Sequence, residues 1–317
     1  MKSLKIALFR ILSLIFRYKK NEKTEEVKDI KSILIIRQDK RIGNILFTTS
    51  LIRLVNEEME VKPDFVVGKR FSEILKNNKR IDKIVEYDQN KMAKNPFKFI
   101  SFIINLRKKE YDLVIDCKDV FSFNNAILTL LAKGRDKIGY RNEMSNEYMT
   151  FSIEFPKNRD ECHEVEYISK PFIEFAGKKL KTPDMEYFIE KGKIYNKETE
   201  KYLKRTKKII AIHIGGRGSK TLSVEIIDRI IEEYKGRIIV LYGPDETEKV
   251  KKIKTEGAFL IKPESIEELA YYIDMSSLFI TPDTGPLHIA SALNKNIAAV
   301  FLKKIITGMD LKQMQNL

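Results

Sequence analysis

The feature that most constrains the fold is a repeat of short apolar runs, each followed by a polar turn containing glycine and then by a helical pattern. Three such units follow one another in the second half of the chain. The apolar runs lie at 209–214, at 237–242 and just before Thr281, and the helices are expected near 223–234, 246–255 and 287–293. This repetition predicts a parallel, doubly wound sheet, whose polar turns face one crevice at the carboxyl ends of the strands.

The first half of the chain follows the same plan. Short strands are expected at 32–37, 64–68 and 113–116, with a turn at 38–43 and a helix at 44–56. The 317 residues therefore divide into two α/β domains of ordinary size. We expect the first domain at 31–185 and the second at 206–317, with a charged, poorly periodic linker at 186–205 between them.

A polar turn in the last of the three units is a candidate for binding phosphate. Asp283 and Thr284 offer side-chain acceptor and donor groups, and Gly285 lets the backbone approach a ligand closely. Pro286 suits a first helical position, which leaves nearby N–H groups and the positive end of the helix dipole for an anion. The alternative interpretation is an ordinary helix start.

Cysteine, histidine and glycine patterns exclude several kinds of site. Cys117 and Cys162 are too few and too far apart for a thiolate metal site, and His163, His213 and His288 lack ligand spacing. The turn HIGGRGSK fits neither a Walker loop nor the dinucleotide-binding glycine pattern, and the chain has no serine nucleophile elbow. The sequence thus predicts no metal and no bound cofactor.

Residues 1–30 are expected to form a basic amphipathic helix and a charged linker. The polar face would carry Lys2, Arg10, Ser13, Arg17 and Lys20, and the opposite face Leu4, Leu8, Ile11, Leu12 and Ile15. A helix of this length reaches only ~25 Å, less than the ~30 Å hydrocarbon core, and no cleavage site for a signal peptide follows it. We expect it to lie on an anionic membrane at the cytoplasmic face. The alternative is a helix packed against its own protein.

The net charge of +14 and the pI near 9.4 agree with a partner that is anionic. Anionic lipid and phosphorylated saccharides both attract such a protein. Nucleic acid is not expected, because the lysines are scattered among glutamates and no basic stripe with interleaved aromatic residues occurs.

Several segments together resemble glycosyltransferase family 9, whose best-known members are the lipopolysaccharide heptosyltransferases. These segments are the turn from Arg37 and Asp39 to Gly43, YDLVIDCK at 111–118, HIGGRGSK at 213–220, YGPDE at 242–246 and PDTGPLHIASAL at 282–293. The resemblance runs from Lys31 to Leu302 and implies a GT-B architecture, in which two Rossmann-like domains face a central cleft. It also implies an inverting, metal-independent transfer from an ADP-heptose donor to a lipopolysaccharide core-type acceptor.

The resemblance also implies roles for single residues on the donor side. Lys220 would contact the donor phosphates, and Glu246 would lie near the nucleotide ribose. His288 would bond the pyrophosphate or hold the loop, beside Asp283, Thr284, Gly285 and Pro286. The alternatives are a solvated lysine at Lys220 and, at Glu246, an acid favoured by a helix dipole.

One position departs from the family pattern at the point where the chemistry is expected. Family members carry an aspartate directly after the glycine that is Gly43 here, and that carboxylate is taken to be the general base, whereas this chain has Asn44. Asparagine cannot accept a proton near neutral pH, and general-base assistance contributes about 10²–10⁴ in rate. Asp39 and Asp116 are the candidates to replace it. The alternatives are a turn-stabilising Asp39 and a buried, hydrogen-bonded Asp116.

Two classes of function follow from this pattern. The first is a membrane-associated glycosyltransferase on the cytoplasmic side, which moves heptose or a related sugar from a nucleotide-sugar donor to a lipopolysaccharide-type acceptor. The second is a non-catalytic relative that keeps the nucleotide-sugar pocket. The family continues with further helices beyond the last apolar strand, so we expect the second domain to be short at its carboxyl end.

Overall fold

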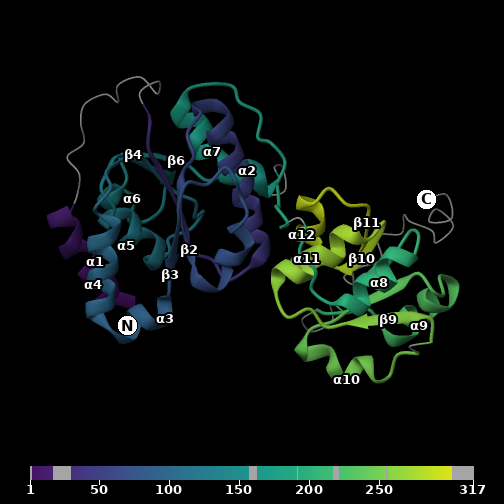
Figure 1. Cartoon of the computed structure of the whole chain (residues 1–317). Helices are drawn as coiled ribbons and strands as arrows, with labels where there is room; N and C mark the ends of the chain where they lie inside the picture. The colour runs from purple at the N-terminus through teal and green to yellow at the C-terminus, as the bar shows by residue number, and fades with distance from the viewer. Residues whose placement is uncertain are drawn as a thin grey trace. The chain divides into compact units, whose positions relative to one another are not determined.

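The computed structural model describes residues 2–16, 30–156, 163–190, 192–216, 221–254 and 256–301. The chain divides into two compact units, Met1–Phe188 and Ile189–Leu317 (Figure 1). Each unit contains one parallel sheet accompanied by helices, which confirms the predicted α/β class.

The first unit is built on a six-stranded sheet in the order β3-β2-β1-β4-β5-β6, and all neighbouring strands are parallel. The strands are β1 Ile33–Arg37, β2 Asp64–Gly68, β3 Ile84–Tyr87, β4 Tyr111–Asp116, β5 Gly134–Tyr140 and β6 Phe151–Ile153. The chain first runs outward from β1 to β3 and then returns to β4 on the other side of β1. The point where the strand order reverses therefore lies between β1 and β4, and the register there pairs Ile36 with Asp116.

Helices cover both faces of this sheet. They are α1 Lys2–Phe16, α2 Ile42–Met59, α3 Gln89–Lys94, α4 Pro96–Leu106, α5 Phe123–Leu131, α6 Ser145–Tyr148 and α7 Glu164–Ala176, with a 3₁₀ turn at Lys69–Leu75. In Figure 1, α1, α4 and α5 lie on one side of the sheet and α2 and α7 on the other. Covered on both sides, β1 is buried at every position, as expected for a central parallel strand.

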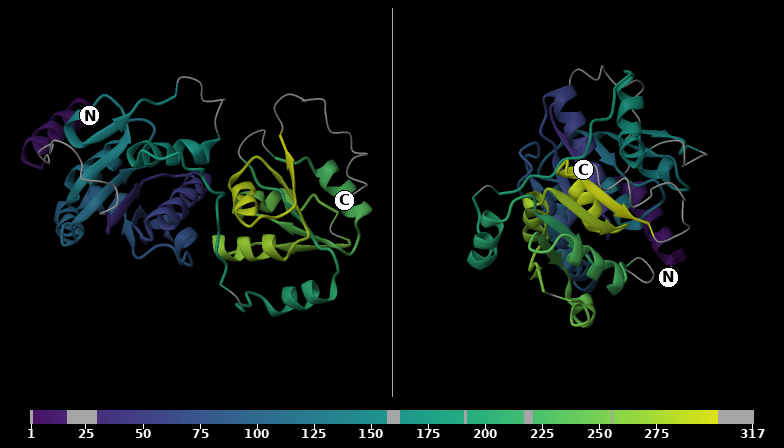
Figure 2. Two further views of the ribbon diagram at one scale, coloured as in Figure 1. Left: turned by 90° about the horizontal axis from the view of Figure 1, so that it is seen from above. Right: turned by 90° about the vertical axis from the view of Figure 1, so that its right-hand side faces the viewer.

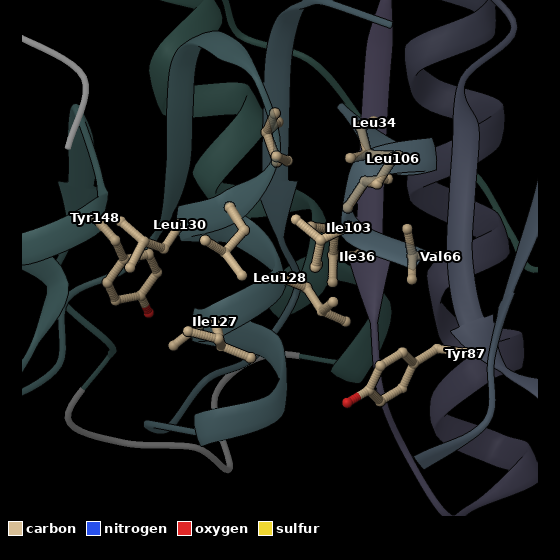
Figure 3. Packing of buried hydrophobic residues seen from close by; sticks show 14 of the residues in the cluster. Leu34, Ile36, Val66, Tyr87, Ile103, Leu106, Ile127, Leu128, Leu130 and Tyr148 are labelled. Carbon is tan, nitrogen blue, oxygen red and sulfur yellow. The ribbon is translucent and has the colours of Figure 1, made fainter. Parts of the chain in front are cut away.

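One hydrophobic core lies between the sheet and the helices α4 and α5 (Figure 3). Leu34 and Ile36 contribute to it from alternate positions of β1, because successive side chains of a strand point to opposite faces. The helices and neighbouring strands supply Val66, Ile103, Leu106, Val114, Ile127, Leu128 and Leu130.

Helix α1 packs against this core through one side only. Phe9 is fully buried, and its ring meets the rings of Phe121 and Tyr148 edge-on, at centroid distances of 6.1 and 5.6 Å. Ser13, one turn later, is also buried, and its hydroxyl lies 3.3 Å from a carboxylate oxygen of Glu147. Both views of Figure 2 draw α1, in purple, on the surface of the first unit. The side of α1 that carries Phe9 and Ser13 therefore packs against the protein itself, which is the alternative given in the sequence analysis.

The other side of α1 is apolar and exposed, with Leu8, Ile11, Leu14 and Ile15 on it. Leu12, which the sequence analysis places on the same apolar face, instead packs against the core. No helix among the described ranges is long and apolar enough to cross a membrane.

The second unit is built on a five-stranded sheet in the order β11-β10-β7-β8-β9, again with parallel neighbours. Its strands are β7 Ile210–His213, β8 Ile238–Leu241, β9 Ala258–Ile261, β10 Leu278–Pro282 and β11 Ile297–Val300. Its helices are α8 Lys197–Arg205, α9 Val224–Glu233, α10 Thr247–Val250, α11 Ile266–Met275 and α12 Gly285–Ala292, with a 3₁₀ turn at Pro244–Glu246. The strand order reverses between β7 and β10.

Two predicted boundaries in the second unit need correction. Helix α8 occupies the second half of the segment 186–205, which the sequence analysis treats as linker. The Asn196 side chain accepts the N–H groups of Glu198 and Thr199 and so caps this helix, while Leu203 is buried. The helix expected at 246–255 is shorter, because Glu246 belongs to a 3₁₀ turn that begins at Pro244 and α10 already ends at Val250.

We expect the stability of the first unit to depend on pH through Lys137. Its side chain is buried and donates to the carbonyl of Leu130 at 2.8 Å, and burial, with the nearby charge of Arg107, lowers the pKa of Lys137 to about 7. Above pH 7 the folded protein holds Lys137 neutral while the unfolded chain still binds the proton up to about pH 10.5, so stability rises with pH across this window.

We expect Lys137→Met to remove this rise, because methionine carries no proton in either state. Denaturant unfolding of the two proteins between pH 7 and 10 measures the difference. Lys133→Met, at an exposed position nearby, should keep the slope of the original protein. A slope that persists in Lys137→Met would contradict the assignment.

Candidate functional site

Charged side chains gather where β1 and β4 end, at the reversal point of the first sheet. The carboxylate of Asp39 lies 3.1 Å from a guanidinium nitrogen of Arg37 and 2.7 Å from the ammonium of Lys118. Burial opposes ionisation of Asp39, but the hydrogen bond from Lys118 and the charges of Arg37 and Lys118 outweigh it, so the pKa of Asp39 lies below its ordinary value. Asp39 is therefore ionised at neutral pH.

Asn44 lies beside this carboxylate. It stands in the first turn of α2, directly after the buried Gly43, and its side chain hydrogen-bonds Asp39. Because the ionised carboxylate can only accept, the Asn44 amide must donate. Asn44, at the position where the family pattern has an acid, is thus a neutral amide that donates to Asp39 in the turn after β1.

Asp116 lies at the end of β4 and is enclosed by donors. It is 1% exposed and accepts from the Asn125 side chain at 2.6 Å, the Lys118 backbone N–H at 3.0 Å and the Tyr148 hydroxyl at 3.3 Å. Burial raises the pKa of Asp116 to about 6, with the hydrogen bonds from Asn125 and Lys118 working against the rise. This environment matches the alternative interpretation of Asp116 as a buried, hydrogen-bonded aspartate.

The sequence analysis assigns no role to three residues that hold this cluster together. Arg37 donates to the carbonyl of Cys117, Lys118 bridges to Asp39, and Asn125 links Asp116 to the carbonyl of Ile36 at 3.0 Å. Lys118 could have been suspected, because it follows a strand end that carries an acid. Asn125 gives no local signal, because its partners are brought to it by the pairing of β1 with β4.

The candidate phosphate-binding turn lies at the reversal point of the second sheet. Helix α12 starts three residues after β10, and Thr284 precedes it in an extended conformation, with no side-chain cap on the helix. Asp283, Thr284 and His288 are half-buried, and the Thr284 hydroxyl lies 3.2 Å from the carbonyl of Pro282. The predicted helix start with Pro286 in its first turn is confirmed.

Glu246 faces the glycine turn that follows β7. One of its carboxylate oxygens accepts a hydrogen bond from the Gly243 N–H at 2.9 Å, which caps the 3₁₀ turn that begins at Pro244. A Cβ atom built on Gly215 would lie 3.1 Å from the Glu246 carboxyl carbon and 3.0 Å from the His213 ring. A side chain at position 215 would require His213 or Glu246 to shift by a few tenths of an ångström, so the turn packs closely against Glu246.

His213 and Lys249 border the same turn. Burial lowers the pKa of His213 to about 4, helped by the charge of Lys249, so the imidazole is neutral. The ammonium of Lys249 donates to the carbonyl of Leu222 and lies 3.4 Å from that of Ile214. These carbonyls flank residues 215–221, so Lys249 joins the two ends of the glycine-rich segment. Lys220 itself lies outside the described residues.

No group of three or more potential metal ligands occurs in the described part of the chain. The arrangement instead offers one charged cluster in the first unit and one helix start with polar side chains in the second. Both lie at the reversal points of parallel sheets, where such sheets bind ligands.

Comparison with known proteins agrees with this layout. The family model for glycosyltransferase family 9 (heptosyltransferase) matches residues 99–304, which is more than half of the chain. The protein belongs to glycosyltransferase family 9. A curated relative of this glycosyltransferase is lipopolysaccharide heptosyltransferase 1 of Campylobacter coli, 25% identical over 295 residues that cover 85% of this chain and 83% of the relative.

Two solved structures show the same fold as this glycosyltransferase. The family 9 glycosyltransferase of Veillonella parvula matches with a TM-score of 0.73 at 15% identity, covering 90% of this chain and 84% of that one. The Escherichia coli heptosyltransferase WaaC, solved with ADP-2-deoxy-2-fluoro heptose, matches with a TM-score of 0.67 at 20% identity, covering 84% and 88%. The predicted GT-B architecture of two Rossmann-like units is confirmed.

Proposed function

We propose that this glycosyltransferase moves a heptose from ADP-heptose to a lipopolysaccharide core-type acceptor, with inversion at the anomeric carbon. The observation that carries the proposal is the start of α12 at the reversal point of the second sheet, in a chain of this family. The neighbour solved with an ADP-heptose analogue and the lipopolysaccharide heptosyltransferase among the relatives support the choice of donor and acceptor.

The second unit would bind the donor. When the sugar leaves, the diphosphate oxygen gains negative charge, which fixed donors and cations stabilise. The first N–H groups of α12, the Thr284 hydroxyl, His288 and Lys220 would hold the diphosphate, and Asp283 would accept from sugar hydroxyls. Glu246, already fixed by Gly243, would present its carboxylate to the ribose. We propose no metal in this transfer.

The first unit would supply the general base. Asp39 and Asp116 both lie at strand ends, but the hydrogen bonds around Asp116 enclose its carboxylate. Asp39 belongs to the turn after β1, and its neighbour Asn44 occupies the family's acid position. We therefore assign the base to Asp39, with Arg37 and Lys118 fixing its orientation, and Asn44 donating to it.

The acceptor is a membrane lipid in this proposal, which places the enzyme at the cytoplasmic face of an anionic membrane. The exposed stripe of α1, formed by Leu8, Ile11, Leu14 and Ile15, supports this location. The second candidate is a non-catalytic relative, favoured by Asn44 at the family's acid position. It would bind ADP and transfer nothing.

Removal of the Lys220 charge tests the donor site. We expect Lys220→Ala to weaken ADP binding by about tenfold to a hundredfold, because a hydrogen bond to a charged group contributes about 1.5–3 kcal/mol. Calorimetric titration with ADP and with UDP, in chelator and in magnesium, measures it. Lys201→Ala, on the exposed surface of α8, should bind like the original protein.

The same titrations test the proposed function as a whole. Binding of ADP in chelator, together with transfer from ADP-heptose to a lipopolysaccharide precursor, supports it. Binding of UDP in preference to ADP would refute the donor assignment, and ADP binding with no transfer to any acceptor would favour the non-catalytic relative.

A further inference from the structure

Two helices of the first unit expose apolar stripes. On α1 the stripe comprises Leu8, Ile11, Leu14 and Ile15, and on α4 it comprises Phe97, Ile100 and Ile104. Leu14 is 85% and Phe97 80% exposed. The α4 residues follow the spacing i, i+3, i+7, so they form one face of the helix, opposite the buried Ile103 and Leu106. Soluble proteins rarely leave such continuous stripes uncovered.

The two helices are neighbours on the same side of the sheet. The ring of Phe16, at the end of α1, lies 5.0 Å from the guanidinium of Arg107, which follows the last residue of α4. Both helices also pack against one core, α1 with Phe9 and α4 with Ile103. Figure 1 draws them next to each other, and Figure 2 shows α1 on the outside of the unit. The two stripes therefore lie on neighbouring helices of the first unit.

The two stretches of chain that carry these stripes contain basic and no acidic residues, and Asp88, just before α3, lies 3.9 Å from the ammonium of Lys91. Residues 1–20 contain no acid, and neither do residues 89–109, which span α3 and α4. Exposed basic side chains on or beside the stripes include Arg10, Lys91, Lys94, Lys98 and Lys108.

We propose that α1 and α4 form a single surface that docks on an anionic lipid bilayer. The inference rests on the proposed lipid acceptor and adds a second helix, from inside the domain, to the membrane-facing part. The apolar side chains would enter the boundary between headgroups and acyl chains, and the lysines would contact lipid phosphates. A second copy of the chain fits less well, because pairing this surface with itself would bring like charges together.

Vesicle binding tests the role of α4 directly. We expect Phe97→Ser/Ile100→Ser/Ile104→Ser to lower partitioning onto vesicles containing phosphatidylglycerol by at least about tenfold, and Leu8→Ser/Ile11→Ser/Ile15→Ser to do the same. The matched control is Ile194→Ser/Ile226→Ser/Met275→Ser, at exposed apolar positions of the second unit, which should bind unchanged. Thermal unfolding of each variant confirms that the fold is kept.

The charges are tested separately. Lys94→Gln/Lys98→Gln should lower binding by about tenfold or more, since each lysine near an anionic surface contributes about 1 kcal/mol. Lys178→Gln/Lys179→Gln, an exposed pair after α7, is the control and should have no effect. If the original protein bound phosphatidylcholine vesicles as well as vesicles containing phosphatidylglycerol, the proposed role of the lysines would be overturned.

The remaining outcomes separate this inference from the proposed function. Unchanged vesicle binding by the α4 serine variant would overturn the role of α4 while leaving α1 as the anchor. No binding of the original protein to anionic vesicles would overturn the whole surface, and ADP titration would still test the donor site. Self-association that the α4 variant abolishes, without loss of lipid binding, would mark the stripe as a contact between copies.

Discussion

Asp39→Asn should lower kcat by about 10²–10⁴ and leave the dissociation constant of ADP unchanged, because the substitution removes the proposed base and keeps the size of the side chain. ADP would bind to the second unit, whereas Asp39 belongs to the first. Single-turnover transfer from ADP-heptose measures the rate. The control Asp82→Asn changes an exposed carboxylate just before β3, at the opposite end of the parallel strands from Asp39, and should keep most of the activity.

Exchanging the side chains of Asp39 and Asn44 tests whether Asp39 is the general base or only stabilises the structure. In Asp39→Asn/Asn44→Asp the carboxylate returns to the family's position, so we expect much of the lost rate to recover. Asn44→Asp alone places two carboxylates side by side, and their repulsion should raise the pKa of one of them and shift the acidic limb of the pH profile upward. Failure of the double variant to recover, with its fold intact, would count against Asp39 as the base.

The second large effect concerns stability. Phe9→Ala should lower the free energy of unfolding by about 3–5 kcal/mol, because it removes a fully buried aromatic ring from contact with Phe121, Phe123 and Tyr148. Urea denaturation followed by circular dichroism measures the loss. Leu14→Ala on the exposed side of the same helix should change the stability by less than about 0.5 kcal/mol.

Because Phe9 is part of the core, membrane binding should be tested with substitutions in α1 and not with its deletion. Deletion of residues 1–20 would remove Phe9 along with the exposed stripe, so lost vesicle binding could come from a damaged core. Serine substitutions at Leu8, Ile11 and Ile15 leave Phe9 in place and avoid this ambiguity. An unfolding energy of Phe9→Ala equal to that of the original protein would show that α1 is not part of the core.

Much of the fold could be predicted because its signals are local. The strand β7 was expected at 209–214 and is Ile210–His213, since a central parallel strand reads as an unbroken apolar run. The start of α12 was likewise predicted, because glycine and proline mark it in the sequence. Helix α8 was missed since its charged surface hides the small buried face that Thr199 and Leu203 provide.

The site could be predicted only in part, because its contacts depend on topology. Asp39 and Asn44 were singled out together, but their hydrogen bond was not foreseen. The ion pair of Lys118 with Asp39 joins residues 79 positions apart, and it exists because β4 pairs with β1. A helical projection of α1 separates polar from apolar positions, yet it cannot tell that Phe9 faces a protein core while Leu8 does not.

The burial of Phe9 also fixes how the first unit can meet a flat surface. A helix on a loose chain would let the domain tumble above the bilayer, whereas α1 is locked to the same core as the β1 strand. Any surface that binds the outer stripe of α1 therefore holds the strands at one tilt. The distance of Asp39 from the bilayer surface would then be set by the structure of the first unit. Only acceptors whose reactive hydroxyl lies at that distance from the bilayer would reach Asp39.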